Sequence, residues 1–118
     1  MQLEKEIVRY SKINGYAISR YYDLKCLCGS SEFRLYSDDD EGGAYAVCVK
    51  CGSEHDIESS KAYMSSVSQN VCSCEYSGLN LGVGKSYFSD IEEPKWTYVG
   101  AHCPKCGLSG VYVDWEEL

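Results

Sequence analysis

Residues 26–51 read CLCGSSEFRLYSDDDEGGAYAVCVKC, and this stretch decides the fold. It begins with a Cys-x-Cys pair and ends with a Cys-x-x-Cys pair, and the same order returns in residues 72–106. Together the two stretches use all eight cysteines of the chain. They are Cys26, Cys28, Cys48 and Cys51 in the first set, and Cys72, Cys74, Cys103 and Cys106 in the second. Because four thiols held by two short turns are typical of a structural metal site, the sequence predicts two such sites.

The length of the chain limits how it can fold. The chain has 118 residues, so the unit around each cysteine set has fewer than about fifty. Units this small bury too little apolar surface to fold without disulfides or a bound metal. The N-terminal residues contain no apolar signal region, and no stretch approaches the ~18 apolar residues of a membrane span. We therefore expect a cytoplasmic protein without a membrane segment, where reducing conditions favour metal binding over disulfides.

The pattern of apolar residues predicts a mostly β chain with little helix and with small antiparallel sheets. The two cysteine sets resemble those of zinc ribbons, which implies two tandem zinc-ribbon-like units. The repeated cysteine order and a repeated acidic turn indicate an internal duplication. Four segments are expected along the chain: a lead-in at residues 1–25, a first ribbon at 26–58, a serine-rich linker at 59–71 and a second ribbon at 72–118.

Within these segments the expected elements are short. A helix is predicted over residues 2–13, and a strand over residues 16–24 leads into the first cysteine pair and extends the first sheet. The remaining strands are expected at residues 33–36, 44–47, 55–58, 79–83, 96–101 and 110–115. Glycine follows three of the four cysteine turns, whereas Glu75 follows the turn at Cys72, which makes that turn the least regular of the four.

Zinc is the metal that we expect at both sites, because redox-inert tetrahedral thiolate sites are the commonest use of this spacing. Iron in a rubredoxin-like site is a less frequent alternative, and disulfides are a third. A site closed by four sulfurs has no open position for water or substrate. The two Zn(II) ions are therefore expected to stabilise the fold and not to catalyse a reaction.

The paired cysteine motifs separated by a hairpin resemble the zinc-ribbon and rubredoxin-like group of folds. The stretch CPKCG at residues 103–107 is similar to the second knuckle of rubredoxins. The layout also resembles that of small uncharacterised bacterial proteins with paired ribbons. The resemblance implies the metal ligands and their hairpins, and it implies no particular function.

Other motifs do not indicate an enzyme. His55 and His102 lie close to cysteines, but each set already has four thiols, so we expect ordinary structural roles for both. The zinc-deaminase pattern fails because Asp56 and Ile57 follow His55 and the proline lies inside the cysteine pair. No nucleophile elbow, phosphate loop or pair of catalytic carboxylates is recognisable, so we expect a non-catalytic protein.

The net charge of −7 is concentrated in the two ribbons, whereas residues 1–25 carry a small excess of base. Each zinc bound by four thiolates would add two further negative charges, which disfavours a nucleic-acid backbone as the partner. The acidic turns between the cysteine pairs have two interpretations: solvated hairpin tips, or patches that bind a basic partner. The candidate partner-binding residues are Asp38, Asp39, Asp40 and Glu41 in the first turn, and Asp90, Glu92 and Glu93 in the second.

Three functions are therefore compatible with the sequence. The first is a protein-binding module for a basic protein, such as an acidic inhibitor or an immunity protein that protects against a nuclease toxin. The second is a nucleic-acid-binding or transcription-related ribbon, in which some of the eleven tyrosines and two tryptophans stack on single-stranded bases. The third is a rubredoxin-like electron carrier, which requires iron in place of zinc.

Overall fold

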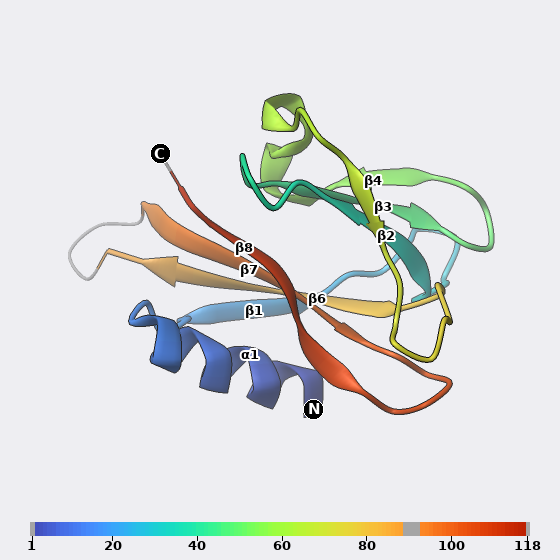
Figure 1. The fold of residues 1–118 in the computed structure, drawn as a ribbon, viewed down its shortest axis with the longest axis horizontal. Coiled ribbons are helices and arrows are strands. Elements are labelled where there is room, and N and C mark those ends of the chain that lie inside the picture. The colour runs from blue at the N-terminus through green and yellow to red at the C-terminus, as the bar shows by residue number, and fades with distance from the viewer. Residues whose placement is uncertain (1, 89–92, 118) are drawn as a thin grey trace.

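The computed structural model describes residues 2–88 and 93–117 of the chain (Figure 1). One α-helix begins the chain, two short 3-10 helices lie near its middle, and the other elements are strands. In order they are α1 (Gln2–Asn14), β1 (Arg20–Asp23), β2 (Phe33–Ser37), β3 (Ala44–Cys48), β4 (Glu54–Asp56), η1 (Ile57–Ser59), η2 (Lys61–Tyr63), β5 (Ser68–Asn70), β6 (Asn80–Tyr87), β7 (Pro94–His102) and β8 (Ser109–Glu116). The prediction of a mostly β chain with a short N-terminal helix is confirmed.

The strands form two four-stranded antiparallel sheets. The first sheet has the order β4-β3-β2-β5, and the second sheet has the order β1-β6-β7-β8. Each sheet thus takes three strands from one cysteine repeat and one strand from the other. The prediction that the lead-in strand extends the first sheet is wrong, because β1 pairs with β6 of the second sheet. The expected linker contributes β5, which pairs with β2 of the first sheet.

The two repeats exchange these strands reciprocally. Phe33 lies five residues after Cys28, and Leu79 lies five residues after Cys74. These equivalent residues pair with each other: each backbone N–H donates to the other's carbonyl at 2.8 Å. The pair joins the two sheets at the point where the two cysteine repeats meet, and an internal duplication stays a prediction from the sequence.

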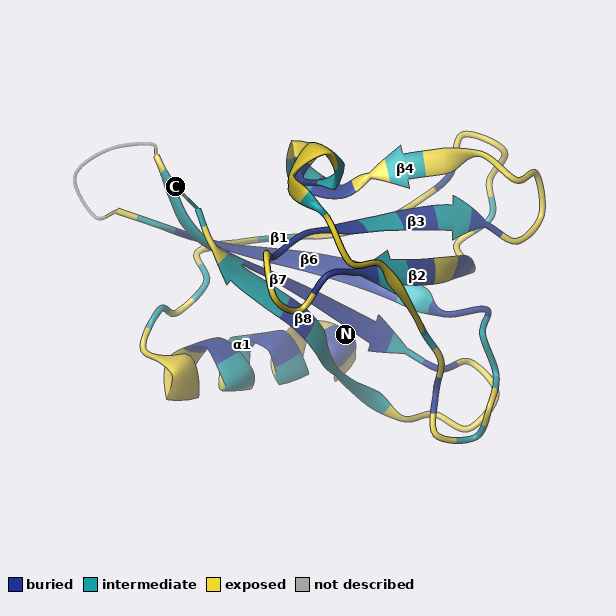
Figure 2. Cartoon of the chain, turned by 45° about the horizontal axis from the view of Figure 1, so that its top comes forward, coloured by how far each residue is buried: buried dark blue, intermediate teal, exposed yellow. Residues whose placement is uncertain are grey.

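A hydrophobic core lies between the sheets and draws side chains from both repeats. Figure 2 shows the buried parts of β2, β3, β6 and β7 gathered where the sheets meet. The largest of these buried apolar side chains are Phe33, Leu35, Ile57, Leu79, Leu81, Val83 and Val99. Because each repeat is small, sharing one core buries more apolar surface than two separate ribbons would.

The helix α1 covers the outer face of the second sheet (Figure 1). Leu3 and Ile7 are buried and lie four residues apart, as expected for one face of a helix. Ile7 packs over Gly84 and Gly100, where an added Cβ atom would come within 2.7 Å and 2.8 Å of its side chain. The missing side chains of these glycines therefore let the helix approach the sheet closely.

The segment after β4 turns back toward the second sheet. Glu58 and Ser59 have φ values of 55° and 57°, in the left-handed region that side chains other than glycine seldom adopt. Glu58 accepts a hydrogen bond of 2.6 Å from Tyr22 Oη and forms an ion pair with Lys85. These contacts tie the first repeat to β1 and β6. Within the described ranges, no helix combines the length and hydropathy needed to cross a membrane.

Candidate metal centres and an acidic groove

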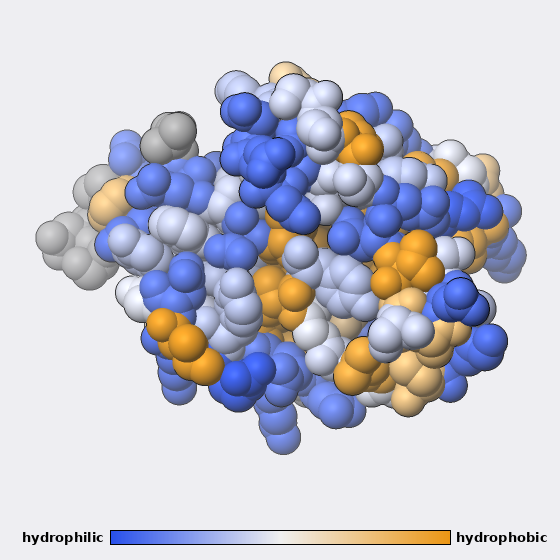
Figure 3. All heavy atoms as spheres, in the orientation of Figure 1, coloured by the Kyte–Doolittle hydropathy of each residue, from blue (hydrophilic) through white to orange (hydrophobic). Residues whose placement is uncertain are grey.

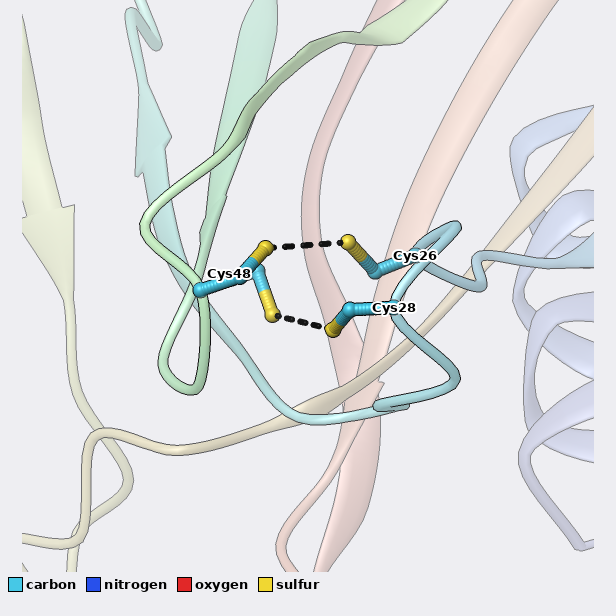
Figure 4. Close-up of side chains that lie close together, drawn as sticks. Cys26, Cys28 and Cys48 are labelled. Carbon is cyan, nitrogen blue, oxygen red and sulfur yellow. Dashed lines mark hydrogen bonds between the residues drawn. The ribbon is translucent and has the colours of Figure 1, made fainter.

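The structure brings the eight cysteines together in the two sets that the sequence predicts. In the first set, Cys26 and Cys28 lie in the turn between β1 and β2, and they face the turn that follows β3 (Figure 4). The Sγ atoms of Cys26 and Cys51 are 3.4 Å apart, and those of Cys28 and Cys48 are 3.6 Å apart. The side chains of the four residues converge on one point from two sides.

The second set repeats this geometry closely. The Sγ atoms of Cys72 and Cys106 are 3.5 Å apart, and those of Cys74 and Cys103 are 3.6 Å apart. In both sets the outer cysteines pair with each other, and so do the inner ones. The four sulfur atoms of each set lie within 4.8 Å of one another. This spacing suits a tetrahedral ion, because four sulfurs bound to zinc at ~2.3 Å are separated by about 3.8 Å.

The thiols are free and do not form disulfides. A disulfide needs a sulfur separation of about 2.05 Å, which is far shorter than the separations of 3.4–3.6 Å in the two sets. Four convergent sulfur donors in each set can therefore hold one metal ion each. Neither His55 nor His102 belongs to these groups of described residues. His55 packs edge-on against Phe33, and His102 Nδ1 is hydrogen-bonded to Ser109 Oγ at 2.6 Å.

The turns that aim the thiols are alike in their backbone geometry. After Cys48 and Cys103, the N–H groups of Gly52 and Gly107 donate back to the cysteine carbonyls at 2.9 Å and 2.8 Å. Both glycines have positive φ values, 78° and 84°. Such turns favour glycine because it lacks a Cβ atom.

The two Cys-x-Cys turns differ in the residue that follows the second cysteine. Gly29 follows the first turn with a φ of 93°, and Glu75 follows the second with a φ of 74°. Each donates its N–H to the carbonyl of the first cysteine in its turn, at 2.9 Å and 2.7 Å. The turn at Cys72 lacks the trailing glycine of the other three turns, yet its backbone has the same shape as that of its counterpart. It achieves that shape with a side chain in a strained backbone region.

Backbone N–H groups favour the thiolate form of Cys48 in the first set and of Cys72 in the second. The N–H of Cys51 lowers the pKa of Cys48 to about 6, and the N–H of Cys74 lowers the pKa of Cys72 to about 7. At Cys26, the N–H of Cys28 lowers the pKa, but burial and the adjacent thiols outweigh it and raise the pKa to about 12. A metal ion would take the place of the protons that such closely packed thiols otherwise retain.

The acidic turn of the first repeat does not lie fully in solvent. Asp38 is buried, and its carboxylate accepts hydrogen bonds from the backbone N–H groups of Asp40, Glu41, Ser65 and Ser66 at 2.8–3.1 Å. The donation from Ser66 and Ser65 is the largest cause that holds the pKa of Asp38 well below its usual range. The assignment of Asp38 to an exposed partner-binding patch is therefore wrong, because its charge is used to fix the local backbone.

The other predicted acidic residues have different positions. Asp39, Asp40 and Glu41 are exposed at the tip of the β2–β3 hairpin, and Glu93 is exposed at the start of β7. Asp90 and Glu92 lie outside the described residues. The exposed carboxylates stay candidates for partner binding.

A groove of about 430 Å³ lies between the C-terminal end of β8 and the loops of the first repeat. Its lining residues are Glu41, Gly42, Glu58, Ser59, Ser60, Tyr63, Trp115, Glu116 and Glu117. Four of these are glutamates, two are aromatic, and none of the described lining residues is basic. Figure 3 shows mostly hydrophilic side chains over the upper part of this face of the molecule.

Two of the four glutamates already interact with other side chains of the protein. Burial raises the pKa of Glu58, but its hydrogen bonds with Lys85 and Tyr22 outweigh this and lower it. Glu117 accepts a hydrogen bond from Thr97. Among the described residues, none pairs with the side-chain carboxylate of Glu41 or Glu116. Sequence analysis missed this groove because its walls come from residues 41–63 and 115–117, which only the strand exchange brings together.

A comparison of the chain with protein-family models, curated proteins and solved structures finds no match. The functional assignment therefore depends on the geometry of the sites and on the charge of the molecule.

Proposed function

We propose that the chain is a zinc-stabilised, non-catalytic module that binds a basic protein through its acidic surface. An acidic inhibitor, such as an immunity protein that covers the cationic surface of a nuclease toxin, is the most concrete form of this proposal. The observation that carries it is the groove, where two glutamates without partners in the described chain lie beside Trp115 and an exposed Tyr63. Aromatic rings beside carboxylates suit lysine and arginine side chains, which bind both.

Zinc is supported by the donor set, because four thiolates in a closed tetrahedral arrangement are typical of structural zinc. Metal analysis of the purified protein tests this assignment, with two zinc ions per chain as the expected result. A coloured protein that contains iron would instead support the electron-carrier alternative. With zinc in both sites the chain becomes more negative than −7, since four thiolates and one Zn(II) add a charge of −2 at each.

The charge distribution supports a cationic partner. Acidic surfaces attract basic proteins over several ångströms and orient them before contact, which raises association rates. The exposed tip residues Asp39 and Asp40 lie in the same hairpin as Glu41 of the groove. The tip and the groove together form an acidic surface that a basic protein can contact at several points.

Charge reversal tests the proposal. A partner captured by the tagged protein from cells of its native host should be lost with the Glu41→Lys/Glu116→Lys variant. The matched control carries two reversals on α1, Glu4→Lys and Glu6→Lys, which change the net charge equally but lie outside the groove. Equal capture by both variants and the wild-type chain would contradict a role for the groove.

A second candidate function is favoured by one observation. Tyr36 and Tyr45 stack on the outer face of the first sheet, with ring centroids 5.0 Å apart and planes 10° apart. Half-buried aromatic rings on a sheet are typical platforms for unpaired bases. Salt-sensitive binding of single-stranded RNA or DNA, weakened by Tyr36→Ala, would favour this candidate over the protein-binding one.

A further inference from the structure

The edge of the second sheet is suited to pairing with another chain. β8 is its outermost strand and is eight residues long, whereas the other edge strands, β1, β4 and β5, have only three or four residues. An edge strand of this length presents a row of backbone N–H and C=O groups without partners. β8 contains no proline and no lysine, which are residues that commonly protect such edges.

The direction of the free backbone groups follows from the pairing with β7. The N–H of Glu117 donates to the carbonyl of Lys95 at 2.9 Å, so the backbone of Glu117 points toward β7. Because these groups alternate sides along an antiparallel strand, the N–H and C=O groups of Asp114 and Glu116 point away from β7. Within the part of the chain that the structure describes, no hydrogen bond joins these four groups to another segment.

The free edge and the acidic groove meet at the same end of β8. Trp115, Glu116 and Glu117 line the groove and also belong to, or directly follow, this strand. A segment that pairs with β8 therefore passes the groove wall. Since alternate side chains of a strand point to the same face, every second residue of that segment can direct its side chain toward the face of the sheet on which Trp115 lies, where the carboxylate of Glu41 is unpaired in the described chain.

We infer that the basic partner is bound as an extended segment that adds a strand alongside β8, with alternate lysine or arginine side chains in the acidic groove. This inference rests on the proposed function and adds the mode of recognition to it. Main-chain hydrogen bonds at the edge supply affinity, and the groove selects for positive charge at alternate positions.

A pair of substitutions at one position separates the backbone contribution from the charge. Glu116→Ala and Glu116→Pro both remove the carboxylate, but only the proline also removes the outward N–H. The N–H of residue 116 points away from β7, so its loss leaves the β7–β8 hydrogen bonds intact. Thermal unfolding followed by circular dichroism verifies that both variants keep the fold.

The probe is an acetylated and amidated peptide of alternating lysine and valine, about as long as β8 and labelled with a fluorophore. Its binding to the zinc-loaded protein is measured by fluorescence anisotropy at physiological salt. We expect the Glu116→Pro variant to bind about fivefold more weakly than Glu116→Ala, which corresponds to one hydrogen bond. A version of the peptide with N-methyl groups on alternate backbone nitrogens, equal in charge, should also bind more weakly to the wild-type chain.

The outcomes distinguish the inference from the proposed function. If the Ala and Pro variants bind equally and N-methylation has no effect, edge pairing is overturned, while weaker binding by Glu116→Ala than by wild type would still support the acidic groove. If neither variant weakens binding, and Glu41→Ala does not weaken it either, the groove itself is excluded as the site for basic segments. Self-association of the wild-type chain through β8, detected by light scattering and abolished by Glu116→Pro, would replace the basic segment by a second copy and overturn the inference.

Discussion

The two sheets have the same strand order but different outer faces. Tyr36 lies eight residues after Cys28 and Gly82 eight residues after Cys74, while Tyr45 and Gly100 each precede a later cysteine by three residues. The two tyrosines are cross-strand partners in the first sheet, and the two glycines are cross-strand partners in the second. Where the first sheet has stacked rings, the second has space that Ile7 and Tyr21 fill.

This difference shows which parts of two sheets with the same strand order are free to differ. The cysteines, their turns and the central bridge are nearly identical in both repeats, because the metal sites and the core depend on them. The outer faces are not constrained in this way. On the second sheet glycines admit the helix, and on the first sheet tyrosines fill the equivalent space and leave rings at the surface.

The largest expected effect concerns the metal ligands. Cys48→Ser and Cys103→Ser each remove one thiolate at equivalent positions, and a structural zinc contributes on the order of 10 kcal/mol to folding, as much as a typical domain's total stability. Because each sheet contains a strand of the other repeat, either variant should loosen both sheets. Hydrogen exchange measured by mass spectrometry, together with zinc content, tests this. Full protection of the sheet whose own site is intact would mean that the repeats fold independently.

The next largest effect is expected on stability, from substitutions at equivalent positions on the two outer faces. Gly100→Ala places a Cβ atom 2.8 Å from Ile7, and such overpacking costs about 1–3 kcal/mol. Tyr45→Ala removes a half-buried ring that stacks on Tyr36 and lies beneath the Lys61 ammonium, and it should cost about 0.5–1.5 kcal/mol. Urea unfolding of both variants measures the difference. On an Ile7→Ala background the Gly100→Ala substitution should cost much less, and an unchanged cost would mean that α1 does not set the constraint.

A smaller effect is expected at Asp38, where the two hairpins also differ. Asp38→Asn removes a carboxylate that accepts four backbone N–H groups, and it should lower the urea midpoint at neutral pH. The folded pKa of Asp38 is depressed, so its contribution is complete above the unfolded value of about 3.9 and is lost as the pH falls below it. The difference in urea midpoint between the variant and the wild type should therefore be constant near neutral pH and should become smaller below about pH 4. A difference in urea midpoint that increases on acidification would contradict this account.

Sequence reasoning found what depends on local spacing. The eight ligands, the helix and the hairpins follow from residues close together in the chain, and cysteine turns carry a strong local signal. The strand exchange was not predictable in this way. The strand at residues 20–23 has the same pattern whether it pairs with β2 or with β6, and only the shared core selects its partner.

The same limit applies to the acidic residues. In the sequence, Asp38 cannot be distinguished from Asp39 or Asp40, yet the return of the chain at Ser65 and Ser66 buries only Asp38. In the sequence, Glu116 and Glu117 are only an acidic pair at the end of the last strand. The structure places the loops of the first repeat beside them, and this forms the groove.

The smallest effect is expected from exchanging the residue that follows each Cys-x-Cys turn. Glu75 occupies the left-handed region with a φ of 74°, where Gly29 stands in the first turn, and a non-glycine residue there costs about 1 kcal/mol. Glu75→Gly should therefore strengthen zinc binding at the second site about fivefold, as measured by competition with a chelator. The reverse exchange, Gly29→Glu, should weaken the first site by a similar factor. If Glu75→Gly weakens the second site, the Glu75 side chain must support the turn, and the two knuckles are less alike than their backbones.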